Sequence, residues 1–170
     1  TWAVFSRRDL AGRMTMLDDM RESMGAALKY LGYSLNSTDQ AELEAAGRLL
    51  EDWRANLADF KVDEANIGLG AGEYDAVHGY NGDLSLLMAE NDDVDFFVPA
   101  EGSAVTTDHF VVLAYSRQAS LAHAFINHLL DPRQAAVNMA DIQYYMPIPE
   151  AVELLPPAIR ENPAFSVPPE

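Results

Sequence analysis

Carboxylates that suit a charged ligand gather in one short stretch. Asp18, Asp19 and Glu22 follow directly after the apolar run Met14–Leu17. The apolar run predicts a buried strand, and apolar residues spaced by three and four from Met20 to Leu31 predict a helix. The carboxylates therefore stand where a strand's carboxyl end meets a helix N-terminus. Ligands of open α/β sheets bind at that edge, and carboxylates there would suit an ammonium group.

The same residues have a second interpretation that needs no ligand. Asp19 followed three positions later by Glu22 is a capping box, and a helix dipole favours acids in the first turn. Gly32 stands where the helix would end in a left-handed residue. Both interpretations stay open, because one carboxylate can cap the helix while the other faces a cleft.

Composition limits the classes of partner. The 170 residues contain 27 acidic and 11 basic side chains, for a net charge of −16. A charge of this sign repels nucleic acid and attracts small cations, so we expect no nucleic-acid partner. Cysteine is absent, which excludes disulfides, thiolate metal sites and cysteine nucleophiles. No apolar run approaches the roughly 20 residues of a membrane span.

Further strands and helices alternate along the chain and predict an α/β fold. We expect strands at Met14–Leu17, Tyr74–Tyr80, Val94–Val98 and Phe110–Tyr115, all in one mostly parallel sheet with a βααβαβ core. Helices are expected at Met20–Leu31, after Ser37 or Asp39, at Leu84–Ala89, after Ser116, and at Arg133–Ile142 and Glu150–Leu155. Lys61–Gly72 is expected to be a loop or a short helix end, and the proline-rich tail to Glu170 to be extended.

Sequence motifs of common enzymes are missing. The chain has no P-loop, no HExxH, no GxSxG and no histidine–cysteine cluster. We therefore predict no catalytic residue, no metal and no cofactor. His78 is expected to be a buried, hydrogen-bonded strand residue, and Trp53 a core residue.

A family resemblance joins several of these features. The stretch LDDMRESMGAALKYLGYSLNSTD resembles the second-lobe signature of periplasmic polyamine-binding proteins, the spermidine/putrescine solute-binding subunits of ABC importers. Pro99–Gly102 matches the family's proline–x–glutamate–glycine loop. The resemblance implies a type II periplasmic-binding-protein-like lobe at residues 1–115. It also implies a helical segment at 116–170 that packs on a first lobe, which this fragment lacks.

The resemblance also implies the site residues. Asp19 and Glu22 occupy positions that grip the ligand's ammonium groups, and Asp108 matches a third ammonium-binding acid. Tyr80 stands where polyamine binders have tryptophan. Thr106 replaces a second tryptophan that packs on the ligand's methylene groups, so we expect weaker or different amine selectivity.

The predicted function is therefore that of an ABC-importer solute-binding protein for a polyamine or another small cationic amine, with ABC permease subunits as partners. It would be periplasmic, or lipid-anchored and extracellular in a Gram-positive source. We also expect the truncated chain to self-associate through the apolar stripe Leu121, Phe125 and Leu129. The alternatives are an amino-acid derivative or opine-like ligand, a hydrolase using paired carboxylates, or an acidic interaction domain without a small ligand.

Overall fold

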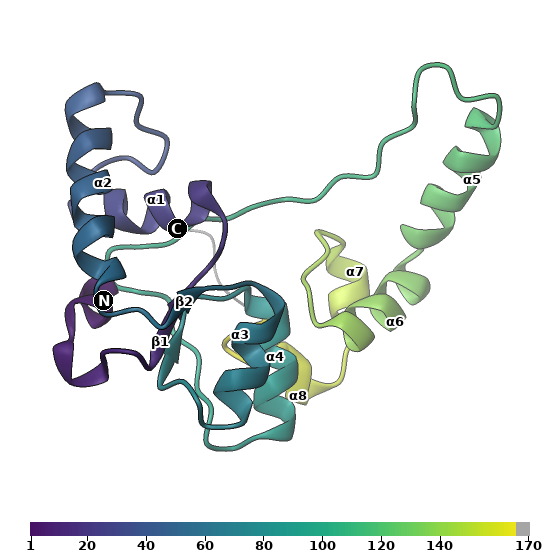
Figure 1. Ribbon diagram of the computed structural model, residues 1–170. Helices are drawn as coiled ribbons and strands as arrows, with labels where there is room; N and C mark the ends of the chain where they lie inside the picture. Colours follow the sequence, from purple (N-terminus) through teal and green to yellow (C-terminus); the bar gives the residue numbers. More distant parts are fainter. Residues whose placement is uncertain (166–170) are drawn as a thin grey trace. The chain divides into compact units, whose positions relative to one another are not determined.

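The chain divides into two compact units. A computed structural model describes residues 1–165, and it separates unit 1, Thr1–Val105, from unit 2, which begins at Thr106 (Figure 1).

Unit 1 is built on a small parallel sheet. Its strands are β1 (Met14–Met16), β2 (Asp59–Phe60) and β3 (Ala76–Val77), in the order β2–β1–β3. Thr15 in the central strand pairs in register with Asp59 on one side and with Val77 on the other. Because both pairings are parallel, the carboxyl ends of all three strands reach the same edge of the sheet.

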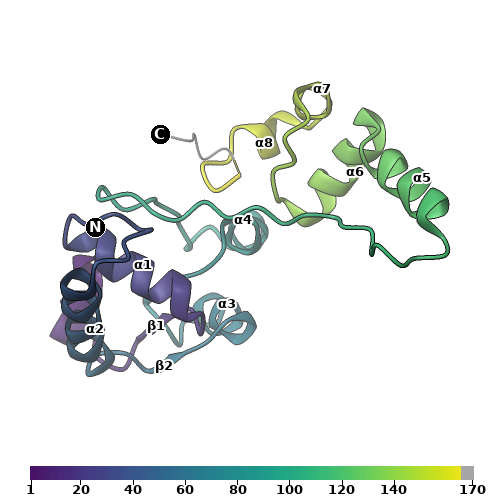
Figure 2. The same cartoon turned by 90° about the horizontal axis from the view of Figure 1, so that it is seen from above.

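Helices surround this sheet. The elements of unit 1 besides the strands are the 3-10 helices η1 (Trp2–Ser6) and η2 (Arg8–Leu10) and the α-helices α1 (Met20–Tyr30), α2 (Gln40–Arg54), α3 (Asp63–Gly70) and α4 (Asn81–Glu90). Figure 2 shows α1 and α2 side by side, with β1 between this pair and α3. The sheet is therefore covered on both faces, as expected for parallel strands.

The main core lies between β1 and the elements η1, α1 and α2. Met14 and Met16 are fully buried there, and Trp53 of α2 is only 1% exposed. The indole of Trp53 packs against the rings of Phe5 and Tyr30 at centroid distances of 5.7 and 5.6 Å. This confirms Trp53 as a core residue. Thr15 points to the opposite face of the sheet, since side chains alternate along a strand.

Local sequence explains both ends of α1. The Asp19 carboxylate accepts hydrogen bonds from the first-turn amides, as the cap prediction required. At the other end, Gly32 has φ +79°, its N–H donates to the Lys29 carbonyl, and the Tyr33 N–H donates to the Leu28 carbonyl. These paired bonds are a Schellman motif, so the predicted left-handed glycine cap is confirmed.

Unit 2 is helical and has a smaller core. It contains α5 (Ala119–Leu129), α6 (Pro132–Ile142), α7 (Pro149–Val152) and α8 (Pro157–Arg160). Its buried cluster comprises Ala135, Ala136, Met139, Ala151, Leu155 and Phe165. No residue of α5 is buried. The helices predicted after Ser116 and at Arg133–Ile142 are confirmed, whereas the helix predicted at Glu150–Leu155 is observed as Pro149–Val152.

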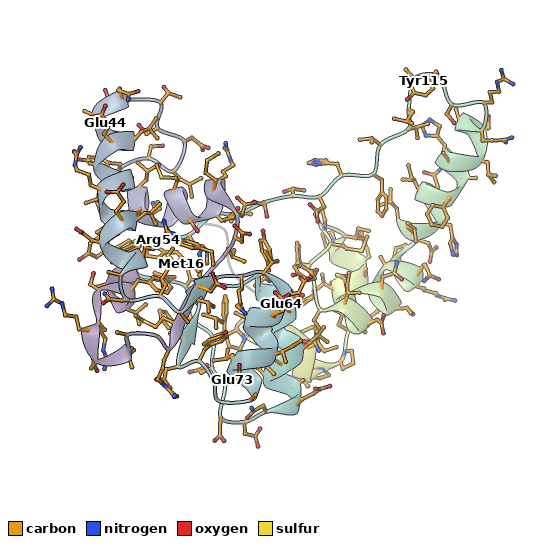
Figure 3. All side chains as sticks on the ribbon, viewed as in Figure 1. Met16, Glu44, Arg54, Glu64, Glu73 and Tyr115 are labelled. Atoms are coloured by element: carbon orange, nitrogen blue, oxygen red, sulfur yellow. The ribbon has the colours of Figure 1, made fainter. Side chains whose placement is uncertain are left out.

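Two predicted strands are wrong. Val94–Val98 and Phe110–Tyr115 form no strand, and the strand predicted at Tyr74–Tyr80 shrinks to Ala76–Val77. Phe97, Phe110 and Tyr115 are 63%, 63% and 83% exposed, and Figure 3 marks Tyr115 on a stretch without helix or strand. The apolar and β-branched composition of the two segments suits a sheet, but a strand forms only beside a hydrogen-bonding neighbour. The described residues provide no such neighbour for either segment.

Two further segments differ from the prediction. Lys61–Gly72 contains α3, which carries Asp63 and Glu64 in its first turn, and the short strand β2 immediately precedes that region. The proline-rich tail contains α8, because Pro157 occupies the first helical turn, where proline is tolerated. Residues 166–170 of that tail lie outside the described part.

The fold class agrees with the prediction, but the positions of the elements in the sheet do not. The chain runs β1–α1–α2–β2–α3–β3, so the strand predicted second, at Tyr74–Tyr80, is the third, and the strand predicted third, at Val94–Val98, does not form. The α/β class with a parallel sheet is confirmed. In the described part of the chain, no helix is long and apolar enough to cross a membrane.

Candidate functional site

Asp19 lies at the junction of β1 and α1. Its Oδ1 accepts hydrogen bonds from the backbone N–H groups of Arg21 and Glu22 at 2.8 and 3.1 Å. The side chain is exposed, so the second carboxylate oxygen remains accessible. Asp19 is therefore a helix cap, and it also presents a negative charge at the carboxyl edge of the sheet.

Glu22 stands one turn into α1 and is half-buried. Burial raises the pKa of its carboxyl group, and the negative charge of Asp19 raises it further, while Arg21 opposes both. Desolvation and a like charge both disfavour the ionised form. A cation bound beside Asp19 and Glu22 would relieve this unfavourable electrostatic situation.

Tyr80 comes from the neighbouring strand. It follows β3 and is the N-terminal cap residue of α4, and its side chain is half-buried. Since β1 and β3 are parallel neighbours, Tyr80 and Asp19 emerge at the same edge of the sheet. The structure thus brings Asp19, Glu22 and Tyr80 to one edge of unit 1.

His78 lies beneath this edge. It is 8% exposed, and its ring meets that of Trp2 edge-on with centroids 4.9 Å apart. Its backbone N–H donates to the Thr15 carbonyl at 2.9 Å, whereas its ring Nδ1 has no partner among the described residues. Burial lowers the pKa of His78 to about 4, although the charge of Asp19 acts against this. The imidazole is therefore neutral at pH 7, and the predicted hydrogen bonding holds for its backbone but not for Nδ1.

Thr106 and Asp108 belong to unit 2. Both are exposed and lie in the stretch without helix or strand that precedes α5. The hydroxyl and the carboxylate are accessible to solvent in that unit.

The loop before this stretch is anchored to the start of the chain. Gly102 has φ +85°, its N–H donates to the Pro99 carbonyl at 2.8 Å, and its own carbonyl accepts from the Trp2 indole Nε1 at 2.9 Å. The carboxylate of Glu101 accepts a hydrogen bond from the Thr1 hydroxyl. Sequence reasoning identified this loop only by its motif. The residue that could have indicated this anchor is Trp2, because a buried indole N–H needs a hydrogen-bond acceptor.

The described residues contain no group of three or more His, Cys, Asp or Glu side chains that could hold a metal ion. The arrangement at the sheet edge instead offers two carboxylates and one aromatic ring. Carboxylates hydrogen-bond strongly to ammonium groups, and an aromatic face attracts a cation.

Known proteins of similar sequence and structure fit this geometry. Residues 1–167 match the family model of the bacterial extracellular solute-binding protein. A putrescine/cadaverine-binding protein of Pseudomonas aeruginosa is 32% identical over 89% of this chain and 44% of its own length. A putative spermidine/putrescine ABC transporter structure from Listeria monocytogenes is 34% identical, with a TM-score of 0.90, over 97% of this chain and 51% of that one.

A lipoprotein of Treponema pallidum is 36% identical, with a TM-score of 0.74, over 84% of this chain and 46% of that one. The chain thus spans about half the length of the relatives that it matches. Two of these relatives are named for solute binding or for transport, and none for an enzymatic reaction. The predicted periplasmic-binding-protein fold is confirmed, and these names favour solute binding over the hydrolase alternative. The chain belongs to the bacterial extracellular solute-binding protein family.

Proposed function

We propose that this chain is the second-lobe portion of an ABC-importer solute-binding protein for a polyamine or another small cationic amine. The observation that carries the proposal is the meeting of Asp19, Glu22 and Tyr80 at one sheet edge. Relatives named for putrescine, cadaverine and spermidine support the class of ligand. In this proposal residues 1–115 form the lobe, and 116–170 pack on a first lobe.

Each residue has a distinct role in the proposed site. Asp19, Glu22 and Asp108 would accept hydrogen bonds from ammonium groups, and each such charge-assisted bond is worth about 1.5–3 kcal/mol. Tyr80 would place its ring against the cationic chain, which adds about 0.5–2 kcal/mol. Thr106 would offer a hydroxyl and a methyl group but no aromatic face. We therefore propose weaker or different selectivity than in polyamine binders that have tryptophan at that position.

The main test is titration calorimetry on the full-length protein with putrescine, spermidine and smaller amines. Asp108→Asn and Asp19→Asn should each weaken amine binding about tenfold or more. Asp39→Asn is the matched control, because Asp39 caps α2 with the same pair of bonds that Asp19 makes at α1. Unchanged affinity in Asp108→Asn would remove Asp108 from the site.

A gain-of-function test addresses Thr106. Thr106→Trp supplies the missing aromatic face, so the affinity for putrescine should rise about two- to thirtyfold if the ring stacks on the ligand. Thr107→Trp, one position along the same exposed stretch, is the control for nonspecific stickiness. An equal gain in both variants would contradict the assigned position.

The raised pKa of Glu22 gives a further expectation. A bound cation favours the ionised carboxylate, so amine binding near the raised pKa should release a proton. Affinity should therefore fall as the pH drops through that pKa. Glu22→Gln should remove this part of the pH dependence in calorimetric titrations, and a persistent dependence would assign it to another group.

We further propose that this chain, prepared alone, self-associates through a second copy. Phe110, Val111 and Leu113 are 63%, 77% and 57% exposed, and Leu121 and Phe125 of α5 are 66% and 57% exposed. Large exposed apolar patches are uncommon in stable monomers. Light scattering over a range of concentrations tests this, and a monomer at high concentration would contradict it.

The proposed location is the periplasm, or the cell surface with a lipid anchor.

A further inference from the structure

Ser23 is a buried polar residue of α1, next in sequence to Glu22. It is only 4% exposed, and its hydroxyl donates a hydrogen bond to the Leu17 carbonyl at 2.8 Å. Its backbone N–H donates to the Asp19 carbonyl at 3.0 Å. Leu17 directly follows β1, and Asp19 is the N-terminal cap of α1. Ser23 therefore ties the start of the helix both to its own cap and to the end of the central strand.

The bond from Ser23 to Leu17 is unusual for a serine inside a helix. A helical serine hydroxyl commonly faces solvent or bonds to the carbonyl four residues earlier, whereas Leu17 stands six residues earlier. The entry angle of a chain into a helix is often fixed by an apolar pair, one residue before the cap and the other at the fourth helical position. In α1 these positions hold Asp18 and Ser23. The buried hydrogen bond replaces the apolar pair.

The bond encloses the residues that carry the charges of the proposed amine site. Asp19 and Glu22 lie between Leu17 and Ser23 in the sequence. Leu17 is 2% exposed, so loss of the serine hydroxyl would leave a buried carbonyl without this donor. The turn could pair that carbonyl again only by moving, and both carboxylates would move with it.

We propose that Ser23 is a positioning residue of the amine site, whose hydroxyl fixes the β1–α1 turn and with it the placement of the Asp19 and Glu22 carboxylates. A pair of carboxylates that is already held in place loses less free energy on ordering when it binds an ammonium group. The inference rests on the proposed function for its ligand. The state of the turn itself can be measured without any ligand.

The test compares two variants of the full-length protein that share a shape and differ in the hydroxyl. Ser23→Thr keeps the donor, and Ser23→Val replaces it with a methyl group on a similar β-branched side chain. In calorimetry with putrescine, Ser23→Val should bind about fivefold or more weakly than Ser23→Thr, the loss expected for one hydrogen bond. Ser23→Ala adds no bulk, so it should weaken binding in the same direction even if the valine variant folds poorly.

A second measurement follows the Glu22 carboxyl group in the ligand-free protein. Burial and the charge of Asp19 raise the pKa of Glu22, so a loosened turn that admits water should lower this pKa towards its ordinary value. A carbon-13 NMR titration should therefore give a lower Glu22 pKa in Ser23→Val and Ser23→Ala than in the wild-type protein and Ser23→Thr. Lower stability of the fold without movement of the turn would leave this pKa unchanged.

Thr15→Val is the matched control. Thr15 of β1 is fully buried, and its Oγ1 has no hydrogen-bond partner among the described residues, so its removal should change neither the putrescine affinity nor the Glu22 pKa. An unchanged Glu22 pKa in Ser23→Val, or an equal change in Thr15→Val, would overturn the inference. A wild-type protein that binds no amine would contradict the proposed ligand, and the Glu22 titration would still decide whether Ser23 holds the turn.

Discussion

The two units of this chain differ in how they use apolar residues. In unit 1, Met14, Met16 and Trp53 are buried around a central strand. In unit 2, α5 has no buried residue, while Leu121 and Phe125 face solvent. Unit 1 thus encloses the apolar side chains of its central strand and the indole of Trp53 within its own fold. Unit 2 has apolar surface suited to a partner, which is why the self-association proposal concerns unit 2 alone.

The largest expected effect tests this difference directly. Trp53→Ala removes a large buried side chain, so it should lower the free energy of unfolding by about 3–5 kcal/mol. Leu121→Ala truncates a side chain that is 66% exposed, and surface substitutions usually cost within about 0.5 kcal/mol. Urea unfolding followed by circular dichroism measures both. A comparable loss in Leu121→Ala would mean that α5 is packed in solution and would break the comparison.

The second largest expected effect is a loss of stability of unit 1 at low pH. Burial lowers the pKa of His78 to about 4 from an ordinary value of 6.5, so the unfolded chain takes up the proton first as the pH falls. The associated stability is fully present above pH 6.5 and is lost as the pH drops towards 4, by about 3 kcal/mol in total. His78→Phe keeps an aromatic ring beside Trp2 but cannot titrate.

The measurement for His78 is the difference in unfolding free energy between the wild-type protein and His78→Phe from pH 7.5 to 4.5. This difference should shift in favour of the variant as the pH falls. His78→Gln should show the same trend, although it loses the ring contact. A difference that does not change with pH would contradict a buried neutral imidazole.

The smallest expected effect is the loss of stability when one of two matching helix caps is removed, one in each unit. Asp39 accepts from the amides of Ala41 and Glu42 at the start of α2, and Asp131 accepts from those of Arg133 and Gln134 at the start of α6. Replacing either aspartate with alanine should cost about 0.5–2 kcal/mol. Hydrogen exchange should show faster exchange in α2 for Asp39→Ala and in α6 for Asp131→Ala. Loosening of both helices by either variant would show that the units unfold as one.

The sequence predicted the features that depend on neighbouring residues. Asp19 and Gly32 define the ends of α1 through bonds within a few positions, so local pattern was sufficient. The strands at Val94–Val98 and Phe110–Tyr115 were wrongly predicted, because pairing depends on a neighbour that local composition cannot reveal. β2 at Asp59–Phe60 was missed because its two residues are too few to give a strand pattern. It is held by its parallel neighbour β1 rather than by its own pattern.

For the candidate site, sequence reasoning placed Asp19 and Tyr80 at strand ends, and the parallel pairing of β1 with β3 brings these ends to one edge. It could not foresee the raised pKa of Glu22, which depends on burial and on the field of Asp19. The exposure of Met20 was also not foreseen. Met20 and Met24 fit the helical pattern of core residues, and only the fold shows that Met20 remains exposed.

The position of the tryptophans has a consequence for spectroscopy. The chain has two tryptophans, and both Trp2 and Trp53 are buried in the core of unit 1. Indole fluorescence therefore reports on unit 1 and is blind to unit 2, whereas far-ultraviolet dichroism also records α5 to α8. If the units melt separately, the two signals will give different midpoints for the same sample. Fluorescence alone would then report the midpoint of unit 1 as if it were the midpoint of the whole chain.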